Sequence, residues 1–293
     1  MTLTETTTRT LEVPGATLTY ELRPGGAPDA PPLFLIGSPM AAAGFGSLAS
    51  RFADRTVVTY DPRGSERSTK ADPSAPSTPE EHADDLHRII AELGAAPVDL
   101  FASSSGAVNA LALVAKHPTD VRTLVAHEPP AVAYLPDAAA AAKASRSVYR
   151  AYMRNGFGAG MARFIALVSH EGPFPDDWAD GPDPDPAMFG LPTEDDGSRD
   201  DALLGQNMES SPHYEFDFDA IRAAPTCVVI AAGTESGQTL AARAAFAVAE
   251  RLGVEAAMFP SHHGGFLGGE YGQAGDPDAF AARLREVLAS AAS

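Results

Sequence analysis

Apolar residues in the first part of the chain gather in short runs rather than in alternation. Such runs occupy residues 31–37 (PPLFLIG), 55–60 (RTVVTY) and 121–127 (VRTLVAH). Strands of a parallel sheet have this pattern because helices cover both of their faces. Residues 10–22 differ: two short alternating segments are separated by Pro14-Gly15, which predicts an antiparallel hairpin.

Helical segments alternate with these strands. The helix expected at 78–93 has the clearest boundaries, with Thr78 as N-cap, Pro79 at N1, Glu81 at N3 and Gly94 at the end. Further strands are expected at 226–233 and 255–260, and further helices at 43–52, 238–252 and 277–291. This alternation predicts an α/β fold with a mostly parallel central sheet and helices on both faces.

The alternation stops between residues 131 and 222. This segment holds Ala-rich amphipathic helices, expected at 137–154 and 160–169, followed by an acidic Pro/Gly-rich stretch without a strand pattern. About ninety residues are too many for an ordinary connection between two strands. We therefore expect residues 131–222 to form a helical cap insertion, and residues 1–130 and 223–293 to form the core domain.

Composition and charge limit the classes of function. The chain is 44% hydrophobic and 20% charged, as in globular proteins, and no run approaches the roughly 20 apolar residues of a membrane span. Its net charge of −18 repels phosphate backbones, which argues against nucleic acid as a partner. The polar N-terminus, MTLTETTTRT, lacks a signal pattern and predicts a cytoplasmic location. The single cysteine, Cys227, is expected to be buried in a strand and cannot form an intrachain disulfide.

The segment 98–117 (VDLFASSSGAVNALALVAKH) carries the strongest chemical signal. An apolar strand passes through small residues, with Ser104 at the apex, into an apolar helix. A nucleophile elbow requires this arrangement, since the turn is too tight for large flanking side chains. Ala102 stands where the motif G-x-S-x-G has its first glycine. Taken alone, the same residues also fit an ordinary serine-capped helix.

Two further groups for serine chemistry follow later strands. A serine nucleophile needs a base, an acid that orients the base, and N–H donors for the oxyanion. In open parallel sheets such groups meet where the carboxyl ends of the strands lie. Glu235 follows the strand expected at 226–233, and His263 lies in a Gly-rich loop after the last strand.

With these residues the chain resembles the α/β-hydrolase superfamily over essentially its whole length. The matching features are the elbow, Asp61-x-Arg63-Gly64 after an earlier strand, the cap-sized insertion, and the sequence His-x-Gly-Phe ending at Phe266. It is most similar to capped hydrolases of the esterase, lactonase, haloperoxidase and C–C hydrolase type. Asp61 and Arg63 are interpreted as structural residues of a tight turn.

The resemblance implies roles for individual residues. Ser104 is the nucleophile and His263, rather than the adjacent His262, the general base. The N–H of Ser105 is one oxyanion donor and that of Ser38 the other, because Pro39 has no N–H.

Two carboxylates compete for the position of the triad acid. Glu235 is favoured because it follows the later strand, where most relatives carry an aspartate. Glu128 is the alternative, since some members of the superfamily take the acid from the loop after the strand that follows the elbow. Glu128 also fits a structural loop carboxylate that pairs with an arginine.

These roles predict a serine hydrolase that cleaves a small or medium apolar carboxylic ester, thioester or lactone. A C–C bond hydrolase or lyase, and a ligand-binding protein without turnover, are the alternatives. A serine nucleophile disfavours dehalogenase and epoxide hydrolase chemistry, which need a carboxylate nucleophile.

The expected partner is a small apolar substrate, held by Met40 and Phe266, and the expected assembly is a monomer or homodimer. Aromatic and methionine residues of the insertion are further candidates for the pocket lining, although their helical spacing fits a core equally well: Tyr149, Tyr152, Met153, Phe157, Met161, Phe164 and Met188. No cofactor is expected, and no metal, because His127, His170 and His213 lack ligand spacing.

Overall fold

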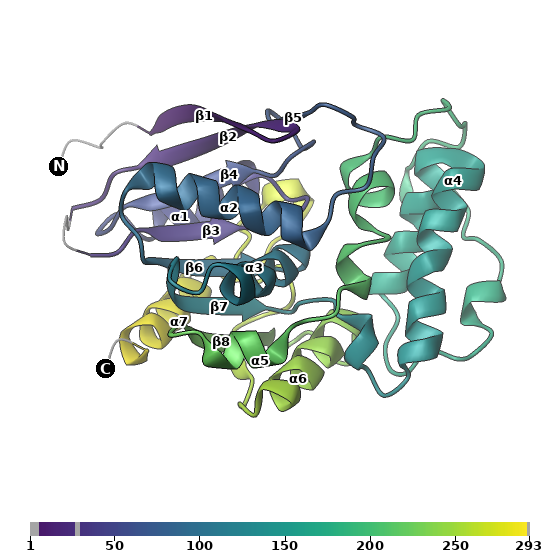
Figure 1. The fold of residues 1–293 in the computed structure, drawn as a ribbon. Coiled ribbons are helices and arrows are strands. Elements are labelled where there is room, and N and C mark those ends of the chain that lie inside the picture. Colours follow the sequence, from purple (N-terminus) through teal and green to yellow (C-terminus); the bar gives the residue numbers. More distant parts are fainter. Residues whose placement is uncertain (1–5, 27–29, 292–293) are drawn as a thin grey trace.

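The computed structural model describes residues 6–26 and 30–291, and a mixed sheet of nine strands forms its centre (Figure 1). The order across the sheet is β1-β2-β4-β3-β6-β7-β8-β9, with β5 paired to β2. The strands from β4 to β9 in this order are parallel, whereas β1, β2 and β5 pair antiparallel. The bounds of the strands are β1 Thr7–Val13, β2 Ala16–Arg23, β3 Leu33–Ile36, β4 Val57–Asp61, β5 Thr69–Lys70, β6 Val98–Ser103, β7 Val121–His127, β8 Cys227–Gly233 and β9 Ala257–Phe259.

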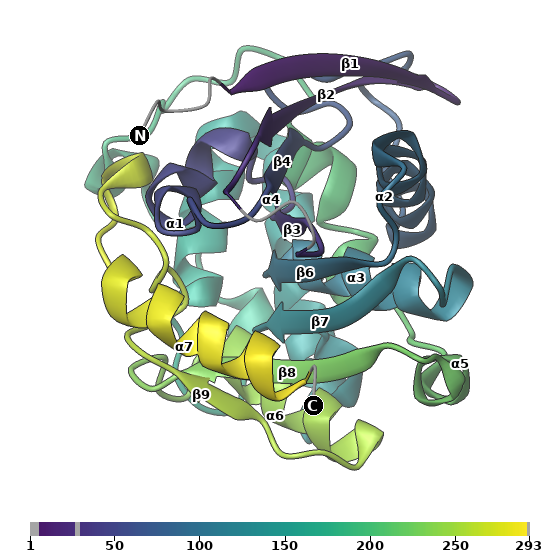
Figure 2. The ribbon, with the colours of Figure 1, turned by 90° about the vertical axis from the view of Figure 1, so that its left-hand side faces the viewer.

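Helices cover both faces of this sheet, as the short apolar runs predict. Figure 2 shows α1 and α7 on one side of the sheet and α2 and α3 on the other. One hydrophobic cluster joins the sheet to α2, α3, α5 and α6, and a second joins it to α1 and α7. The α/β prediction is therefore confirmed. The bounds of these helices are α1 Gly46–Ser50, α2 Pro79–Leu93, α3 Ser105–Lys116, α5 Phe218–Ala223, α6 Leu240–Leu252 and α7 Pro277–Ser290.

The N-terminus of α2 has the cap that its sequence predicts. The Thr78 hydroxyl accepts from the N–H of Glu81 at 3.2 Å, and the Glu81 carboxylate accepts from the N–H of Thr78 at 2.9 Å. Gly94 ends the helix with a φ of 62°, a conformation that favours glycine. The strand and helix periodicities also place β1, β2, α6 and α7 within a few residues of their expected bounds.

Between β7 and β8 the described residues form helices joined by irregular loops, and they form no strand (Figure 1). Its longest element, α4 (Ala138–Val168), joins the two helices expected there across a kink at Gly156, where φ is 80° and ψ is −171°. A third hydrophobic cluster fills the space beneath α4 and extends to α6. The short elements are η2 Val132–Tyr134, η3 Trp178–Asp180, η4 Pro186–Phe189, the π-helical turn η5 Ala202–Asn207, and η6 Ser211–His213.

The turn after β4 fixes neighbouring elements, in line with the structural role expected for Asp61 and Arg63. Asp61 accepts from the N–H of Ala42 at 3.0 Å, which fixes the loop after β3. The Arg63 guanidinium forms two hydrogen bonds of 2.7 Å with Asp85 on α2. Both side chains of this ion pair are buried, 4% and 0% exposed.

Cys227 departs from its predicted environment. It is the first residue of β8 and is exposed, whereas the residues from Ile230 to Gly233 are buried. The expectation of a buried cysteine is therefore wrong, because the apolar run enters the core only after its first positions. No helix in the described ranges is long and apolar enough to cross a membrane.

The buried Arg63–Asp85 pair makes a prediction for stability. In Arg63→Ala the carboxylate of Asp85 keeps its buried position without its cation, so the free energy of unfolding falls by about 3–5 kcal/mol. Urea denaturation of the purified chain measures this change. Arg154→Ala is the control: it removes an ion pair of the same 2.7 Å length in which the arginine is 62% exposed, and it costs less than about 1 kcal/mol. Equal losses in the two variants would contradict the prediction.

Candidate active site

Ser104 stands at a sharp turn between β6 and α3. Its backbone has φ 57° and ψ −131°, a conformation that serine rarely adopts. The Ser104 N–H donates to the carbonyl of His127 at 2.9 Å, which ties the turn to the end of β7. Ser104 is half-buried between the buried residues Ser103 and Ser105. The turn therefore presents one serine and hides its two neighbours.

A close approach of two backbones brings the loop after β3 to this turn. A Cβ built on Gly106 would lie 2.8 Å from the Cα of Gly37, so only glycine fits at position 106. The next residue of that loop, Ser38, is buried. Ser105 begins α3, and the first N–H groups of a helix have no acceptor within the helix. The two candidate oxyanion donors, the N–H groups of Ser105 and Ser38, thus belong to two segments that contact each other beside Ser104.

Glu128 and His263 meet at the same edge of the sheet. The Nδ1 of His263 lies 2.6 Å from Oε2 of Glu128. Glu128 directly follows β7 and is fully buried, whereas the His263 side chain is 43% exposed. With Nδ1–H donated to the carboxylate, Nε2 of the neutral imidazole keeps its lone pair. The geometry therefore leaves a base nitrogen available on a half-exposed ring.

The second carboxylate oxygen of Glu128 is also occupied. The Gly233 N–H, at the end of β8, donates to Oε1 at 2.8 Å. Burial favours the neutral acid, but the hydrogen bond and the charge of His263 outweigh it and lower the pKa of Glu128 from 4.5 to about 2. The carboxylate therefore stays ionised at neutral pH without direct contact with water.

Glu235, the favoured acid in the sequence, lies elsewhere. It is exposed, and its N–H donates to the carbonyl of Ser261 at 2.8 Å. Within the described residues its carboxylate forms no hydrogen bond with His263, so the structure brings Glu128 to the imidazole and leaves Glu235 outside. Glu128 has a positive φ of 50°, and its side chain is buried against the imidazole, whereas the side chain of Glu235 is exposed.

The adjacent His262 faces its own loop. Its Nδ1 accepts from the N–H of Gly264 at 3.1 Å, and its Nε2 lies 3.3 Å from the carbonyl of Ala274. Both ring nitrogens thus support the Gly-rich loop, and His263 alone of this pair reaches Glu128.

Unusual backbone conformations gather at this edge of the sheet. Ser104, Glu128 and Ser261 follow β6, β7 and β9, and all three have positive φ, of 57°, 50° and 69°. Non-glycine residues in this region carry strain that surrounding contacts must hold in place. Such strain commonly marks functional sites. Here the three strained residues all follow strands of the parallel sheet at the end where Glu128 and His263 meet.

The hydroxyl of Ser104 forms no hydrogen bond with His263 in the described structure. Hydrogen bonds between nucleophile and base are often long before substrate binds and tighten in the complex. The structure thus brings together the carboxylate and the imidazole, and it places the serine at the end of the neighbouring strand.

Sequence reasoning gave no role to His127, which lies behind this pair. His127 is fully buried between Phe101, Phe259 and Phe280, and neither ring nitrogen has a hydrogen-bond partner among the described residues. Burial lowers its pKa from 6.5 to about 4, so the ring is neutral at pH 7. One nitrogen of His127 lies within 4.8 Å of ligand atoms of Glu128 and His263, a grouping that could also hold a metal ion. Only the fold reveals it, because the sequence separates these rings by more than a hundred positions.

The predicted pocket residues have different environments. Met40 is half-buried beside Gly44 and Tyr271, at the loop that contacts the elbow. Phe266 is 1% exposed and stacks on Phe45 with ring centroids 5.3 Å apart, so it anchors the loop of His263 in the core instead of lining a pocket. Most of the candidate lining of the insertion belongs to its own core, namely Tyr149, Tyr152, Phe157, Met161 and Phe164, whereas Met153 and Met188 are exposed.

Comparisons with known proteins agree with this architecture. A family model described as the alpha/beta hydrolase fold matches residues 33–183, just over half of the chain. Over 123 residues the chain is 41% identical to the uncharacterized hydrolase YraK of Bacillus subtilis (strain 168). This match covers 41% of the chain and 44% of the relative, so the chain matches less than half the length of that protein.

Solved structures of similar fold cover nearly the whole chain. A thermophilic esterase from Thermogutta terrifontis superposes with a TM-score of 0.67 at 18% identity, covering 99% of this chain and 100% of that one. The carboxylesterase CesB (YbfK) from Bacillus subtilis has a TM-score of 0.66 at 16% identity and covers 98% and 92% of the two chains. At such identities the likeness is one of fold.

The buried His127 predicts how stability depends on pH. Its pKa is lower in the folded chain than in the unfolded chain, so the unfolded chain binds more protons between pH 6.5 and 4, and stability falls as pH falls through this window. The full effect is about 3 kcal/mol, from the energy of one pKa unit. His127→Phe, which suits the surrounding aromatic rings, removes this loss.

Urea denaturation of both proteins at several pH values between 7.5 and 4 measures the effect. The stability of the variant relative to the native chain should rise by about 3 kcal/mol over this range. His213, whose pKa burial also lowers to about 4, is present in both proteins and cancels in the difference. A difference that stays constant with pH would contradict the prediction.

Proposed function

We infer that this chain, which belongs to the α/β-hydrolase family, is a serine hydrolase that cleaves a small or medium apolar carboxylic ester, thioester or lactone. The contact between His263 and the buried Glu128, at the sheet edge that presents Ser104, carries the proposal. The esterase names of the structures with similar fold are in keeping with it.

The proposed reaction uses three side chains. The Ser104 oxygen attacks the carbonyl carbon of the ester while Nε2 of His263 takes the hydroxyl proton. The resulting oxyanion accepts from the N–H groups of Ser105 and Ser38. When the tetrahedral intermediate collapses, the alcohol leaves with the proton from His263. Water, activated by the same imidazole, then releases the acid and restores Ser104.

Glu128 is the proposed acid of the triad. Its carboxylate fixes the Nδ1–H tautomer of His263 and stabilises the imidazolium that forms during each proton transfer. The ionised state needed for this role is supported by the lowered pKa and by the N–H of Gly233. Glu235 has no part in this mechanism.

The extra methylene of glutamate suits this position. Glu128 follows β7, which lies between the nucleophile strand β6 and β8. Its side chain extends to the end of β8, where the Gly233 N–H holds it. The carboxylate thus reaches the end of β8, although Glu128 itself follows the neighbouring strand β7.

A ligand-binding protein without turnover is the second candidate. It is favoured by the missing hydrogen bond between Ser104 and His263 and by Pro39, which leaves the loop after β3 one N–H fewer near the elbow. Hydrolysis of a simple ester by the native chain separates the two proposals.

The proposed nucleophile predicts covalent labelling. A fluorophosphonate probe should modify the native chain once, at Ser104, because the probe reacts with a serine activated by a neighbouring base. Ser104→Ala should remain unlabelled, and Ser103→Ala is the matched control that keeps the label. Intact-protein mass spectrometry measures both. Equal labelling of the native chain and Ser104→Ala, or no labelling of the native chain, would exclude the mechanism.

The two candidate acids predict different kinetic losses. Glu128→Gln keeps the shape of the side chain but removes its charge, so kcat for p-nitrophenyl acetate should fall about 10³- to 10⁴-fold, as when the acid of other triads is made neutral. Glu235→Gln changes an exposed side chain and should leave kcat within about threefold. The opposite order would assign the acid to Glu235.

A further inference from the structure

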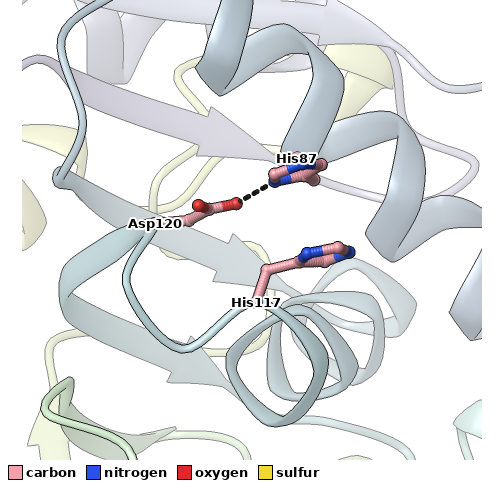
Figure 3. A group of neighbouring side chains, drawn as sticks. All are labelled: His87, His117 and Asp120. Carbon is pink, nitrogen blue, oxygen red and sulfur yellow. Dashed lines mark hydrogen bonds and ion pairs between the residues drawn. The ribbon is translucent and has the colours of Figure 1, made fainter.

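A second group of polar side chains lies at the far end of α3, away from Ser104. It comprises His87 in α2, His117 as the C-cap of α3, and Asp120 just before β7 (Figure 3). Since α3 has 12 residues, its two ends are about 18 Å apart. This group, the His87–His117–Asp120 cluster, therefore lies outside the proposed active site.

The cluster presents nitrogen and oxygen ligands in close proximity. One ring nitrogen of each histidine and one carboxylate oxygen of Asp120 lie within 4.8 Å of one another. The two rings stack with centroids 3.9 Å apart and planes 5° from parallel. Nδ1 of His87 lies 2.7 Å from Oδ2 of Asp120, toward which its ring points in Figure 3.

A further carboxylate orients His117. Oδ1 of Asp84 lies 3.1 Å from Nε2 of His117 and also 2.8 Å from Nζ of Lys116. Histidines that bind metal ions almost always donate their other ring N–H to a carboxylate, a backbone carbonyl or water, which fixes the tautomer. With Nε2–H donated to Asp84, the Nδ1 of His117 carries the lone pair that a metal ion needs.

The backbone around the cluster is fixed before any ion binds. The His117 N–H donates to Leu113 at 2.7 Å, and the Asp120 N–H donates to His117 at 3.2 Å. The Asp120 carbonyl in turn accepts from Val98 of β6 at 2.9 Å. Two of the three ligand residues thus belong to one rigid turn, and the third belongs to a helix packed against it.

We propose that the His87–His117–Asp120 cluster binds a divalent transition-metal ion, for which Zn²⁺ is the probe. Two neutral imidazoles and a carboxylate, with a place left for water, form a ligand set that Zn²⁺ accepts. Tetrahedral coordination brings ligand atoms to about 3.3 Å from one another, so the rings must turn toward a common point. Their half-exposed positions allow this rotation. The bound ion ties α2 to the turn before β7.

Isothermal titration of the full chain, freed of metal by a chelator and dialysed, tests the proposal. We expect one Zn²⁺ per chain at this cluster, with binding weakened about 10- to 100-fold in Asp84→Asn, which loses an orienting partner, and more strongly in His87→Gln and His117→Gln, which lose a ligand. His170→Gln, which changes a histidine of the insertion, is the matched control and should bind normally. Circular dichroism and melting temperature without metal establish that each variant is folded.

The variant His263→Gln separates this site from the grouping of His127, Glu128 and His263. It should keep the binding at the His87–His117–Asp120 cluster, and saturating Zn²⁺ should raise its melting temperature as it does for the native chain. Loss of binding in His263→Gln but not in His87→Gln would place the ion at the catalytic residues and overturn the proposal. A native dissociation constant above about 1 mM would overturn it as well.

Discussion

The candidate site depends on one buried carboxylate. Glu128 has no exposed surface, and its two oxygens are occupied by the imidazole of His263 and the N–H of Gly233. An ionised group without contact with water is stable only when such partners balance the loss of hydration. The same contacts determine the direction of the His263 ring. The interactions that stabilise the buried carboxylate in the folded chain therefore also orient the base.

The parallel sheet makes this contact geometrically accessible. Ser103, His127 and Ala231 lie side by side on β6, β7 and β8, and adjacent strands are about 4.8 Å apart. The residues just beyond these strand ends consequently meet, although they are far apart in the chain. His263 comes from beyond β9 and must reach back across β8, which its Gly-rich loop permits: a Cβ on Gly265 would lie 2.6 Å from the carbonyl of Pro260.

The sequence predicts the elements well because its signals there are local. The capping box of α2, the apolar runs of the parallel strands and the kink region of α4 each depend on neighbouring residues. The contact of Glu128 with His263 has no such local signature, since it requires a φ of 50° at Glu128 and a donor from β8. The sequence therefore identifies both Glu128 and Glu235 as candidates for the triad acid, but it does not show which of them contacts His263. Cys227 was misjudged for a related reason, because an apolar pattern does not say which end of a segment enters the core.

Because the proposed acid, Glu128, follows β7, the loop after β8 does not have to carry a catalytic side chain. An acid carried by that loop would need a side chain held in one direction, whereas Glu128 accepts from the N–H of Gly233, the last residue of β8. A Cβ on Gly233 would lie 2.6 Å from the hydroxyl of Ser236 and 2.7 Å from the carbonyl of Ser261, so this donor sits in a closely packed position. The side chains of Thr234 and Glu235 beyond it are exposed. The end of β8 therefore supplies a fixed N–H donor to the carboxylate of Glu128, and the exposed side chain of Glu235 in the following loop takes no part in this contact.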